Sequence, residues 1–178
     1  MTKGKIIFLN GVTSAGKTSI AKAIQEVAED NFYHVSNDFF LGLEANIVNF
    51  RFIQAHEQLK YMAESIILMY HTVKVLAEQG TNVVVDGMLF ETDGFIEKYG
   101  KTNYENLQQI LGANMFMVEV FCPLEECRRR NKTREDREEN QSHEQHDIMN
   151  KAICYDMMVD TSVNSAEECA AKILEVMK

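Results

Sequence analysis

Residues 5–19 read KIIFLN and then GVTSAGKTS, and this stretch decides how the rest of the sequence is interpreted. The first six residues form a short apolar run, which predicts a buried strand. The pattern G-x-x-x-x-G-K-T follows from Gly11 to Thr18, and residues 17–29 then carry apolar side chains at helical spacing. A strand, a glycine-rich turn and a helix in this order are typical of a phosphate-binding loop.

The residue types in this loop fit the binding of a nucleotide phosphate. Gly11 and Gly16 allow backbone angles and a close approach that a Cβ atom would block. The backbone amides of residues 14–18 can surround a β-phosphate at the start of the helix, where unpaired N–H groups point outward. Lys17 can reach the β- and γ-phosphates, and the Thr18 hydroxyl can bind Mg²⁺. The nucleotide-binding residues expected in the loop are Gly11, Ser14, Ala15, Gly16, Lys17, Thr18 and Ser19.

Strand-like runs alternate with helical patterns along the rest of the chain. We expect strands at 5–10, 32–38, 81–87, 115–121 and 156–162, and helices at 17–29, 54–79, 102–112 and 165–178. Five strands separated by helices predict an α/β fold with a five-stranded parallel sheet covered by helices on both faces. The sequence has one proline and no linker-like segment, so we expect a single domain over residues 1–178.

Composition excludes several classes of protein. A net charge of −9 argues against a nucleic-acid partner. The sequence has no run of about eighteen apolar residues, so no membrane span is expected. The apolar start leads directly into the glycine loop without a cleavage site, which argues against a signal peptide. The four cysteines are scattered and fit neither a zinc site nor a disulfide framework, so we expect a cytoplasmic protein.

Two aspartates follow predicted strands, where the carboxyl ends of parallel strands face a ligand crevice. Asp38 could accept a proton from a hydroxyl that attacks the γ-phosphate, or it could cap the next helix. Asp86 ends the apolar run TNVVVDG and resembles a Walker B aspartate, which holds Mg²⁺ through water. Its alternative role is that of a cap or turn residue, which the following Gly87 would favour.

Residues 128–137, RRRNKTREDR, contain five arginines in ten positions. Arg130, Arg134 and Arg137 would lie on one face of a helix, where guanidinium groups can neutralise a phosphoryl group in transfer. The alternative is a solvated helix whose arginines pair with the neighbouring acidic residues. We interpret residues 124–147 as a lid, with helix, turn and helix, over a nucleotide site.

These motifs together resemble the chloramphenicol phosphotransferase family of P-loop kinases. The resemblance runs through IIFLNGVTSAGKTS, VVVDGMLF, the lid pattern RNKTREDR, Gln145, YDMMVDTS and the helix SAEECA. It implies a P-loop NTPase fold of the nucleotide-kinase type and ATP-dependent phosphorylation of a small-molecule alcohol, which in the founding member is chloramphenicol. It also implies that Asp38 is the general base, that Lys17, Arg134 and Arg137 assist transfer, and that Arg130 contacts the nucleotide.

The sequence departs from this family at positions that bear on the acceptor. Gly87 stands where the chloramphenicol enzyme carries a second acid, and Asn150 stands where a histidine is common. Residues 40–80, which should line the acceptor site, match weakly. Three alternatives therefore stay open: a nucleoside or nucleotide kinase, a nucleotide-sugar kinase in the manner of zeta toxins, and a nucleotide-binding regulator without an acceptor. The sequence leaves the acceptor, the oligomeric state and the biological role open.

Overall fold

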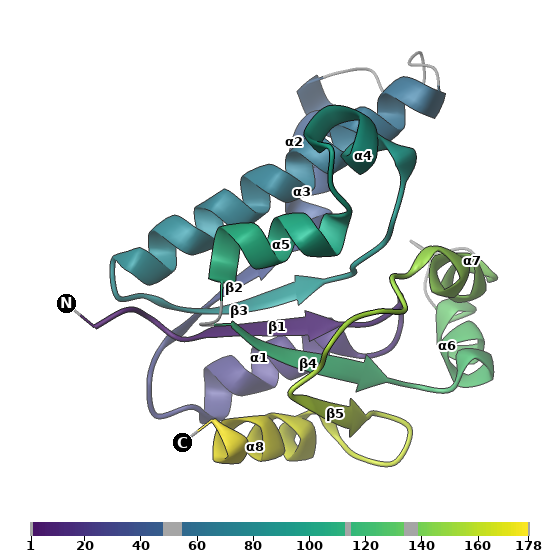
Figure 1. Ribbon diagram of the computed structural model, residues 1–178. Helices are drawn as coiled ribbons and strands as arrows, with labels where there is room; N and C mark the ends of the chain where they lie inside the picture. Colours follow the sequence, from purple (N-terminus) through teal and green to yellow (C-terminus); the bar gives the residue numbers. More distant parts are fainter. Residues whose placement is uncertain (1, 48–54, 113–114, 134–138, 178) are drawn as a thin grey trace.

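The computed structural model describes residues 2–47, 55–112, 115–133 and 139–177, which form a layered α/β fold (Figure 1). Five strands make one sheet in the order β2-β3-β1-β4-β5, and all four neighbouring pairs are parallel. The predicted five-stranded parallel sheet is therefore confirmed. The strands are β1 (Ile6–Asn10), β2 (Phe32–Ser36), β3 (Asn82–Gly87), β4 (Met115–Phe121) and β5 (Met157–Asp160).

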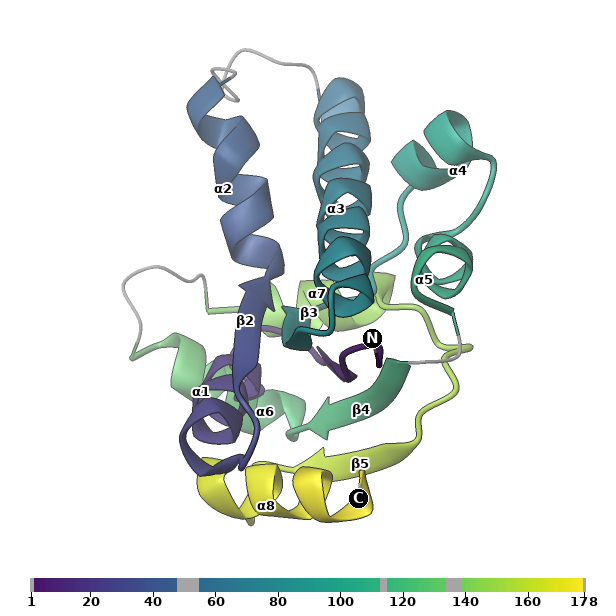
Figure 2. The ribbon, with the colours of Figure 1, turned by 90° about the vertical axis from the view of Figure 1, so that its left-hand side faces the viewer.

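Helices cover both faces of the sheet, as Figure 2 shows. Helices α1 and α8 pack together on one face, whereas α3 packs with α2, α4 and α5 on the other side. The helices are α1 (Lys17–Val27), α2 (Asn37–Ile47), α3 (Ala55–Glu78), α4 (Asp93–Tyr99), α5 (Asn103–Leu111), α6 (Leu124–Asn131), α7 (Gln141–Ile148) and α8 (Ala166–Val176).

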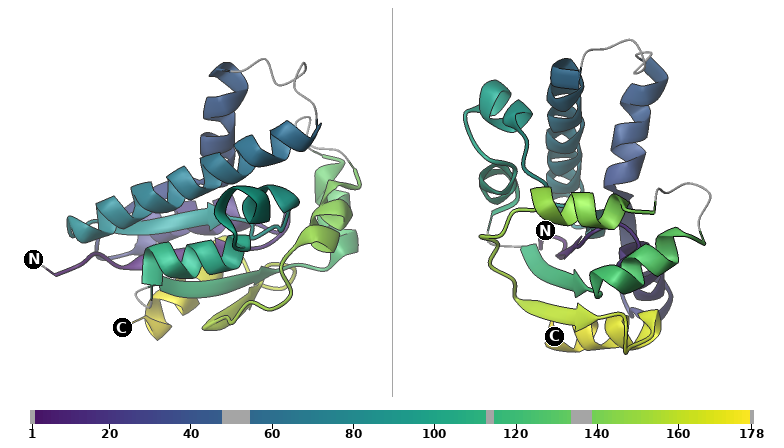
Figure 3. Two further views of the ribbon diagram at one scale, coloured as in Figure 1. Left: turned by 45° about the horizontal axis from the view of Figure 1, so that its top comes forward. Right: turned by 90° about the vertical axis from the view of Figure 1, so that its right-hand side faces the viewer.

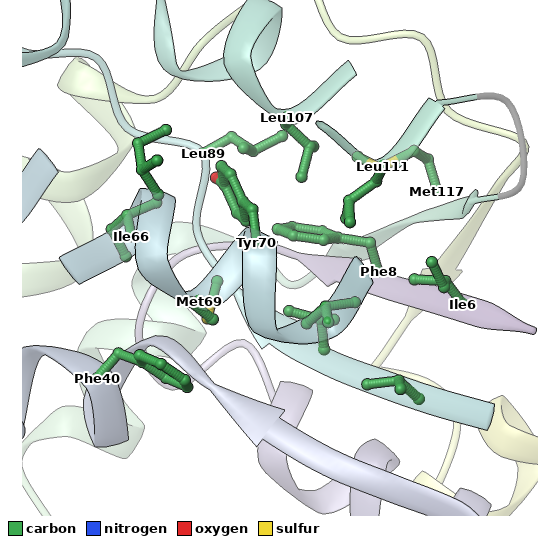
Figure 4. Packing of buried hydrophobic residues seen from close by; sticks show 14 of the residues in the cluster. Ile6, Phe8, Phe40, Ile66, Met69, Tyr70, Leu89, Leu107, Leu111 and Met117 are labelled. Carbon is green, nitrogen blue, oxygen red and sulfur yellow. The ribbon is translucent and has the colours of Figure 1, made fainter. Parts of the chain in front are cut away.

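The central strand β1 is buried on both faces, which explains its unbroken apolar run. Its side chains alternate between two cores. Ile7 and Leu9 belong to the cluster with α1 and α8, and Ile6 and Phe8 belong to the cluster with α3 and α5. Figure 4 shows Phe8 beside Tyr70 of α3, with ring centroids 6.3 Å apart.

The structure contains two helices that the sequence patterns did not predict. The expected strand at 32–38 ends at Ser36, and α2 begins at Asn37. The Ser36 hydroxyl accepts a hydrogen bond from the Phe39 amide at 3.2 Å, which satisfies a free N–H of the first helical turn. Helix α4 has only 7 residues, too few to show a helical period. Asp38 therefore lies inside a helix instead of at a strand end.

Helices α6 and α7 lie beyond the carboxyl ends of the strands (Figure 3). The chain after α7 joins the loop that follows β3: Phe90 and Met149 form an antiparallel bridge. The Glu91 amide donates to the Ile148 carbonyl at 2.8 Å, and the Asn150 amide donates to the Leu89 carbonyl at 2.9 Å. These contacts fix the far end of the α6–α7 segment to the edge of the sheet where a ligand crevice is expected.

Candidate functional site

The loop between β1 and α1 has the shape of an anion-binding turn. Gly16 has a φ of +101°, and Ser14 is the one non-glycine residue of the described chain with a positive φ, at 58°. Alternation of such backbone conformations points successive N–H groups at one spot. A Cβ atom on Gly11 would come within 2.5 Å of the Val120 carbonyl oxygen, so this position accepts only glycine. The loop is thereby held against β4.

Lys17, Thr18 and Asp86 meet at the mouth of this loop. The Thr18 hydroxyl donates to Asp86 Oδ2 at 2.5 Å, and Lys17 Nζ lies 4.0 Å from Asp86 Oδ1. Lys17 Nζ also donates to the Val12 carbonyl at 2.9 Å. The register of the sheet produces this cluster, because Asp86 pairs with Leu9 of β1 just before the loop. Two side-chain oxygens, which could bind a metal ion, and one cation thus lie together beside the loop.

The Asp86 carboxylate is buried but keeps its charge. Burial raises its pKa, yet His34, Lys17 and Thr18 together outweigh burial and hold the pKa below the ordinary aspartate value. His34 Nε2 lies 3.7 Å from Asp86 Oδ2, which is too long for a hydrogen bond. The sequence reasoning missed this neighbour, because it depends on the β2–β3 register.

A cavity of about 720 Å³ opens from the loop between the sheet edge, α2, α3 and the α6–α7 segment. Its lining residues fall into two groups by chemistry and by the elements that carry them, and we name these groups the loop end and the far end. The loop end carries Thr13, Ser14, Lys17, Thr18, Asp86 and Arg130. The far end carries the apolar side chains Leu41, Leu59, Met62, Met88, Phe90 and Ile148, together with Asn37, Asp38 and Thr92. Among the lining residues that the structure describes, only Lys17 and Arg130 are positively charged, and both belong to the loop end.

Asp38 lines this cavity from the first turn of α2. The start of a helix is a favourable place for a carboxylate. The capping role that the sequence left open belongs to Ser36, so Asp38 is exposed toward the cavity instead. Asn37, which the sequence reasoning did not single out, is buried beside it.

Arg130 is the one predicted lid arginine within the described residues. Its guanidinium donates to the Ser14 carbonyl at 3.3 Å and to the Thr161 carbonyl at 2.8 Å. It also pairs with Glu126 at 2.9 Å. In this state it braces the phosphate-binding loop and lines the cavity at the same time. Arg134 and Arg137 lie outside the described residues.

A model of the family described as chloramphenicol phosphotransferase-like protein matches residues 4–178. The chain belongs to this family. A relative from Mycobacterium tuberculosis, whose name gives it as a proposed O-phosphotransferase, is 24% identical over 197 residues, which cover 98% of this chain and 83% of the relative.

Solved structures of P-loop kinases share the fold of this family member. APS kinase of Mycobacterium tuberculosis, in complex with AMPPNP and APS, is similar with a TM-score of 0.69 and 18% identity, over 99% of each chain. Shikimate kinase of Acinetobacter baumannii, in complex with shikimate, is similar with a TM-score of 0.63 and 15% identity, over 99% of this chain and 94% of that chain. Family and fold together support a kinase.

Within the described residues, no helix is both long and apolar enough to cross a membrane.

Three polar residues join separate segments near the loop and the sheet edge, and one of them, Gln145, lines the cavity. The buried Asn10 side chain donates to the Tyr155 hydroxyl at 2.5 Å and accepts from the Leu89 amide at 2.8 Å. Gln145, which belongs to the family pattern, accepts from the Thr13 amide at 2.5 Å and so ties α7 to the loop. Asn150, at the position of the common histidine, donates to Glu91 at 2.7 Å. Asn10 gave no signal in the sequence, because its partners are distant along the chain.

Proposed function

We propose that this protein transfers the γ-phosphate of ATP to a hydroxyl group of a small neutral molecule. The observation that carries the proposal is the pair of chemically different ends of one cavity. The loop end offers amides, Lys17 and Arg130 to an anionic triphosphate. The far end offers an apolar wall with one exposed carboxylate, Asp38. Such a cavity suits an anionic phosphate donor on one side and an uncharged acceptor on the other.

Each site residue has a role in this proposal. Gly11, Ser14, Ala15, Gly16 and Ser19 form the loop that binds the phosphates, and Lys17 stabilises the charge of the transferring group. Asp38 accepts or orients the proton of the acceptor hydroxyl. Arg130, Arg134 and Arg137 surround the nucleotide phosphates.

The residues at the loop mouth fit Mg²⁺, because the Thr18 hydroxyl and the Asp86 carboxylate are adjacent oxygen ligands. Thr18 would bind the ion directly and Asp86 would hold it through water. The ion supplies charge neutralisation between the β- and γ-phosphates.

The α6–α7 segment acts as a lid of a single-domain enzyme in this proposal. Arg130, Gln141, Gln145 and Ile148 line the cavity from this segment. A closed lid excludes water, which would otherwise hydrolyse ATP. A cytoplasmic location also belongs to the proposal, since Cys122, Cys127, Cys154 and Cys169 are all free thiols.

The far end of the cavity favours a neutral acceptor over a nucleotide or nucleotide sugar. An acceptor that carries phosphate would need a cation there, and the described lining residues supply none at that end. Family membership makes chloramphenicol the first alcohol to test.

The test is mass spectrometry of products after incubation with Mg-ATP and chloramphenicol, nucleosides or aminoglycosides. We expect a mass gain of one phosphate on a neutral alcohol. Asp38→Asn should lower the rate about 10²–10⁴-fold, the usual contribution of a general base. Asp93→Asn is the matched control, because Asp93 is also an exposed carboxylate in a first helical turn but does not line the cavity.

Two results would overturn this proposal. Phosphate transfer to an aminoglycoside as the sole product would contradict a neutral acceptor, whereas a phosphorylated nucleoside would only narrow the proposal to a nucleoside kinase. No product with any acceptor, together with ATP hydrolysis that Asp38→Asn leaves unchanged, would favour a nucleotide-binding regulator.

A further inference from the structure

One peptide group of the phosphate-binding loop, between Val12 and Thr13, is bonded at both of its polar atoms. Its carbonyl oxygen accepts a hydrogen bond from Lys17 Nζ at 2.9 Å. Its N–H, which belongs to Thr13, donates to Gln145 Oε1 at 2.5 Å. The described chain contains no cis peptide bond, so this N–H and this carbonyl point in opposite directions. A contact that fixes the direction of one of them therefore fixes the other.

Gln145 reaches this peptide group from α7, in the segment proposed as a lid. Because the Thr13 N–H can only donate, the glutamine must present its oxygen to it, and this fixes the orientation of the side-chain amide. Gln145 lines the cavity together with Gln141 and Ile148, which lie on the same face of α7. Helix α7 thus contacts the backbone of the phosphate-binding loop through the Gln145 side chain.

The Lys17 ammonium lies between two acceptors that compete for it. The Val12 carbonyl is at hydrogen-bond distance, whereas Asp86 Oδ1 lies 4.0 Å away, beyond that distance. A carboxylate attracts an ammonium more strongly than a carbonyl does, so Lys17 stays off Asp86 only while the carbonyl points at it. If the peptide group turned, the ammonium would pair with Asp86. Both groups would then be withdrawn from the phosphates and the metal ion that they are proposed to bind.

The loop backbone makes its own contact with the same carbonyl. The Ala15 amide donates to the Val12 carbonyl at 3.3 Å, which is long for such a bond. Ala15 also supplies one of the amides proposed to surround a phosphate, and a charged phosphate oxygen is the stronger acceptor. Once this amide turns to a phosphate, the bond between Thr13 and Gln145 is what keeps the peptide group oriented.

We infer that Gln145 is a positioning residue, which acts through the Val12–Thr13 peptide group to hold the Lys17 ammonium toward the nucleotide phosphates. The inference rests on the proposed function, in which Lys17 stabilises the transferring group. It adds a link between the lid and this lysine. When α7 lies against the loop, the peptide carbonyl points at Lys17, and when α7 moves away, this constraint is lost. Gln145 needs no contact with the nucleotide or the acceptor for this role.

The test is a double-mutant cycle on nucleotide binding, with Gln145→Met and Lys17→Ala. Methionine is similar to glutamine in length and shape, but it is only a weak acceptor for the Thr13 amide. The dissociation constant of a non-hydrolysable ATP analogue is measured with Mg²⁺ by isothermal titration calorimetry. We expect Gln145→Met to weaken binding roughly tenfold, the usual value of one hydrogen bond to a charged group. In the Lys17→Ala protein, the same change should have almost no further effect.

Two controls separate this role from the packing of α7. In a Lys22→Ala background, Gln145→Met should keep its full effect, because Lys22 lies on the exposed face of α1. Gln141→Met changes the same residue type on the same face of α7, where the Thr13 amide is bonded to Gln145 instead. Whatever the size of its own effect, Gln141→Met should weaken binding by the same factor in the wild-type and Lys17→Ala proteins.

Equal effects of Gln145→Met in the wild-type and Lys17→Ala proteins would overturn the inference, because Gln145 would then act independently of Lys17. Unchanged binding in Gln145→Met alone would also overturn it. If Gln145→Met does not fold, a crystal structure of the wild-type protein with the ATP analogue decides. In that complex, Gln145 Oε1 must lie about 2.7–3.2 Å from the Thr13 amide nitrogen, and Lys17 Nζ must lie as close to the Val12 carbonyl oxygen.

The cycle also keeps the inference apart from the proposed function. Because binding is measured, a protein that shows the expected cycle but phosphorylates no alcohol would refute the proposed function alone. A protein that transfers phosphate but shows independent effects of the two substitutions would refute the inference alone. No binding of the ATP analogue by the wild-type protein would refute both.

Discussion

The two ends of the cavity are built by different means. At the loop end, several polar side chains are held by the protein itself: Thr18 bonds to Asp86, Lys17 to the Val12 carbonyl, and Arg130 to the Ser14 carbonyl. The Ser14 hydroxyl is the exception, since it has no partner among the described residues. At the far end, Asn37 Oδ1 and Thr92 Oγ1 have no partner in the described chain, and the remaining wall is largely apolar. Most side chains at the loop end are therefore already positioned before a ligand binds.

We infer from this difference that the fold fixes the geometry of the phosphate-binding loop, whereas the side chains at the far end decide which acceptor binds. A phosphate-binding loop needs a fixed array of amides, so its geometry is set by backbone conformation at Gly11, Ser14 and Gly16. An acceptor pocket needs a shape and a few polar groups, which many different side chains can supply. We therefore expect substitutions at the loop end to affect catalysis, and substitutions at the far end to affect the choice and binding of the acceptor.

Among substitutions at the loop end, the largest effect should come from Lys17→Ala. Removing this cation takes away charge stabilisation of the transferring phosphoryl group, and we expect the turnover rate to fall about 10²–10³-fold. Acceptor binding should stay unchanged, because Lys17 lies at the loop end. The measurement is steady-state kinetics with Mg-ATP, and Lys22→Ala on the exposed face of α1 is the matched control. If Lys17→Ala instead raised the KM for the acceptor and left the turnover rate unchanged, the division of roles between the two ends would be contradicted.

The next effect concerns Asn10, a buried residue at the end of β1 that joins three segments of the chain. Asn10 is fully buried and bonds to the Leu89 amide and the Tyr155 hydroxyl. In Asn10→Ala both partners lose their hydrogen bond, and we expect the free energy of unfolding to fall by about 2–3 kcal/mol. Urea unfolding measures this loss. Tyr155→Phe removes only one of the two bonds and should cost about 1 kcal/mol. Equal stabilities of wild-type protein and Asn10→Ala would show that water replaces the side chain.

Whether a feature could be predicted from the sequence depends on whether it is set by neighbouring residues or by residues far apart in the chain. The loop, the following helix and the alternation of strands and helices depend on neighbours in the sequence, so short patterns indicate them. The five-stranded parallel sheet followed from that alternation, and the structure confirms it. The P-loop kinase fold followed from the resemblance to the chloramphenicol phosphotransferase family, and the similar solved structures confirm it. Residues 124–131 and 141–148 also form the two helices expected in the lid segment.

The long-range contacts around the site could not be predicted, because they join residues that are distant in the sequence. Asn10 and Tyr155 are separated by 145 positions. The approach of His34 to Asp86 requires the β2–β3 register, which pairs Ser36 with Asp86. The start of α2 at Asn37 places Asp38 in a helix, and the apolar run before it gave no sign of this boundary.

A smaller effect is expected from the apolar wall of the far end. Met62 of α3 lines the cavity, and Met62→Ala removes several methylene-sized contacts with a bound acceptor. We expect the KM for the acceptor to rise about tenfold while the KM for ATP stays unchanged. Leu68→Ala on the same helix is the control, because Leu68 is 54% exposed and does not line the cavity. A parallel rise in the KM for ATP would mean that the two ends are not independent.

The smallest effect is a dependence of stability on pH at alkaline values. Burial raises the pKa of Tyr155 to about 12, although its hydrogen bond with Asn10 acts in the opposite direction. Because the raised pKa belongs to the folded state, Tyr155 supports folding fully below the ordinary tyrosine pKa near 10, and this support is lost as the pH rises toward 12. The ring is half-buried, so solvent screening limits the loss to about 1 kcal/mol.

We therefore expect the difference in unfolding free energy between wild-type protein and Tyr155→Phe to shift by this amount between about pH 9 and about pH 11. Other groups that titrate in this range, such as the buried Tyr70, are present in both proteins and cancel in the difference. A constant difference across the range would mean that Tyr155 titrates like an exposed tyrosine, and that the wall beside Asn10 is open to water.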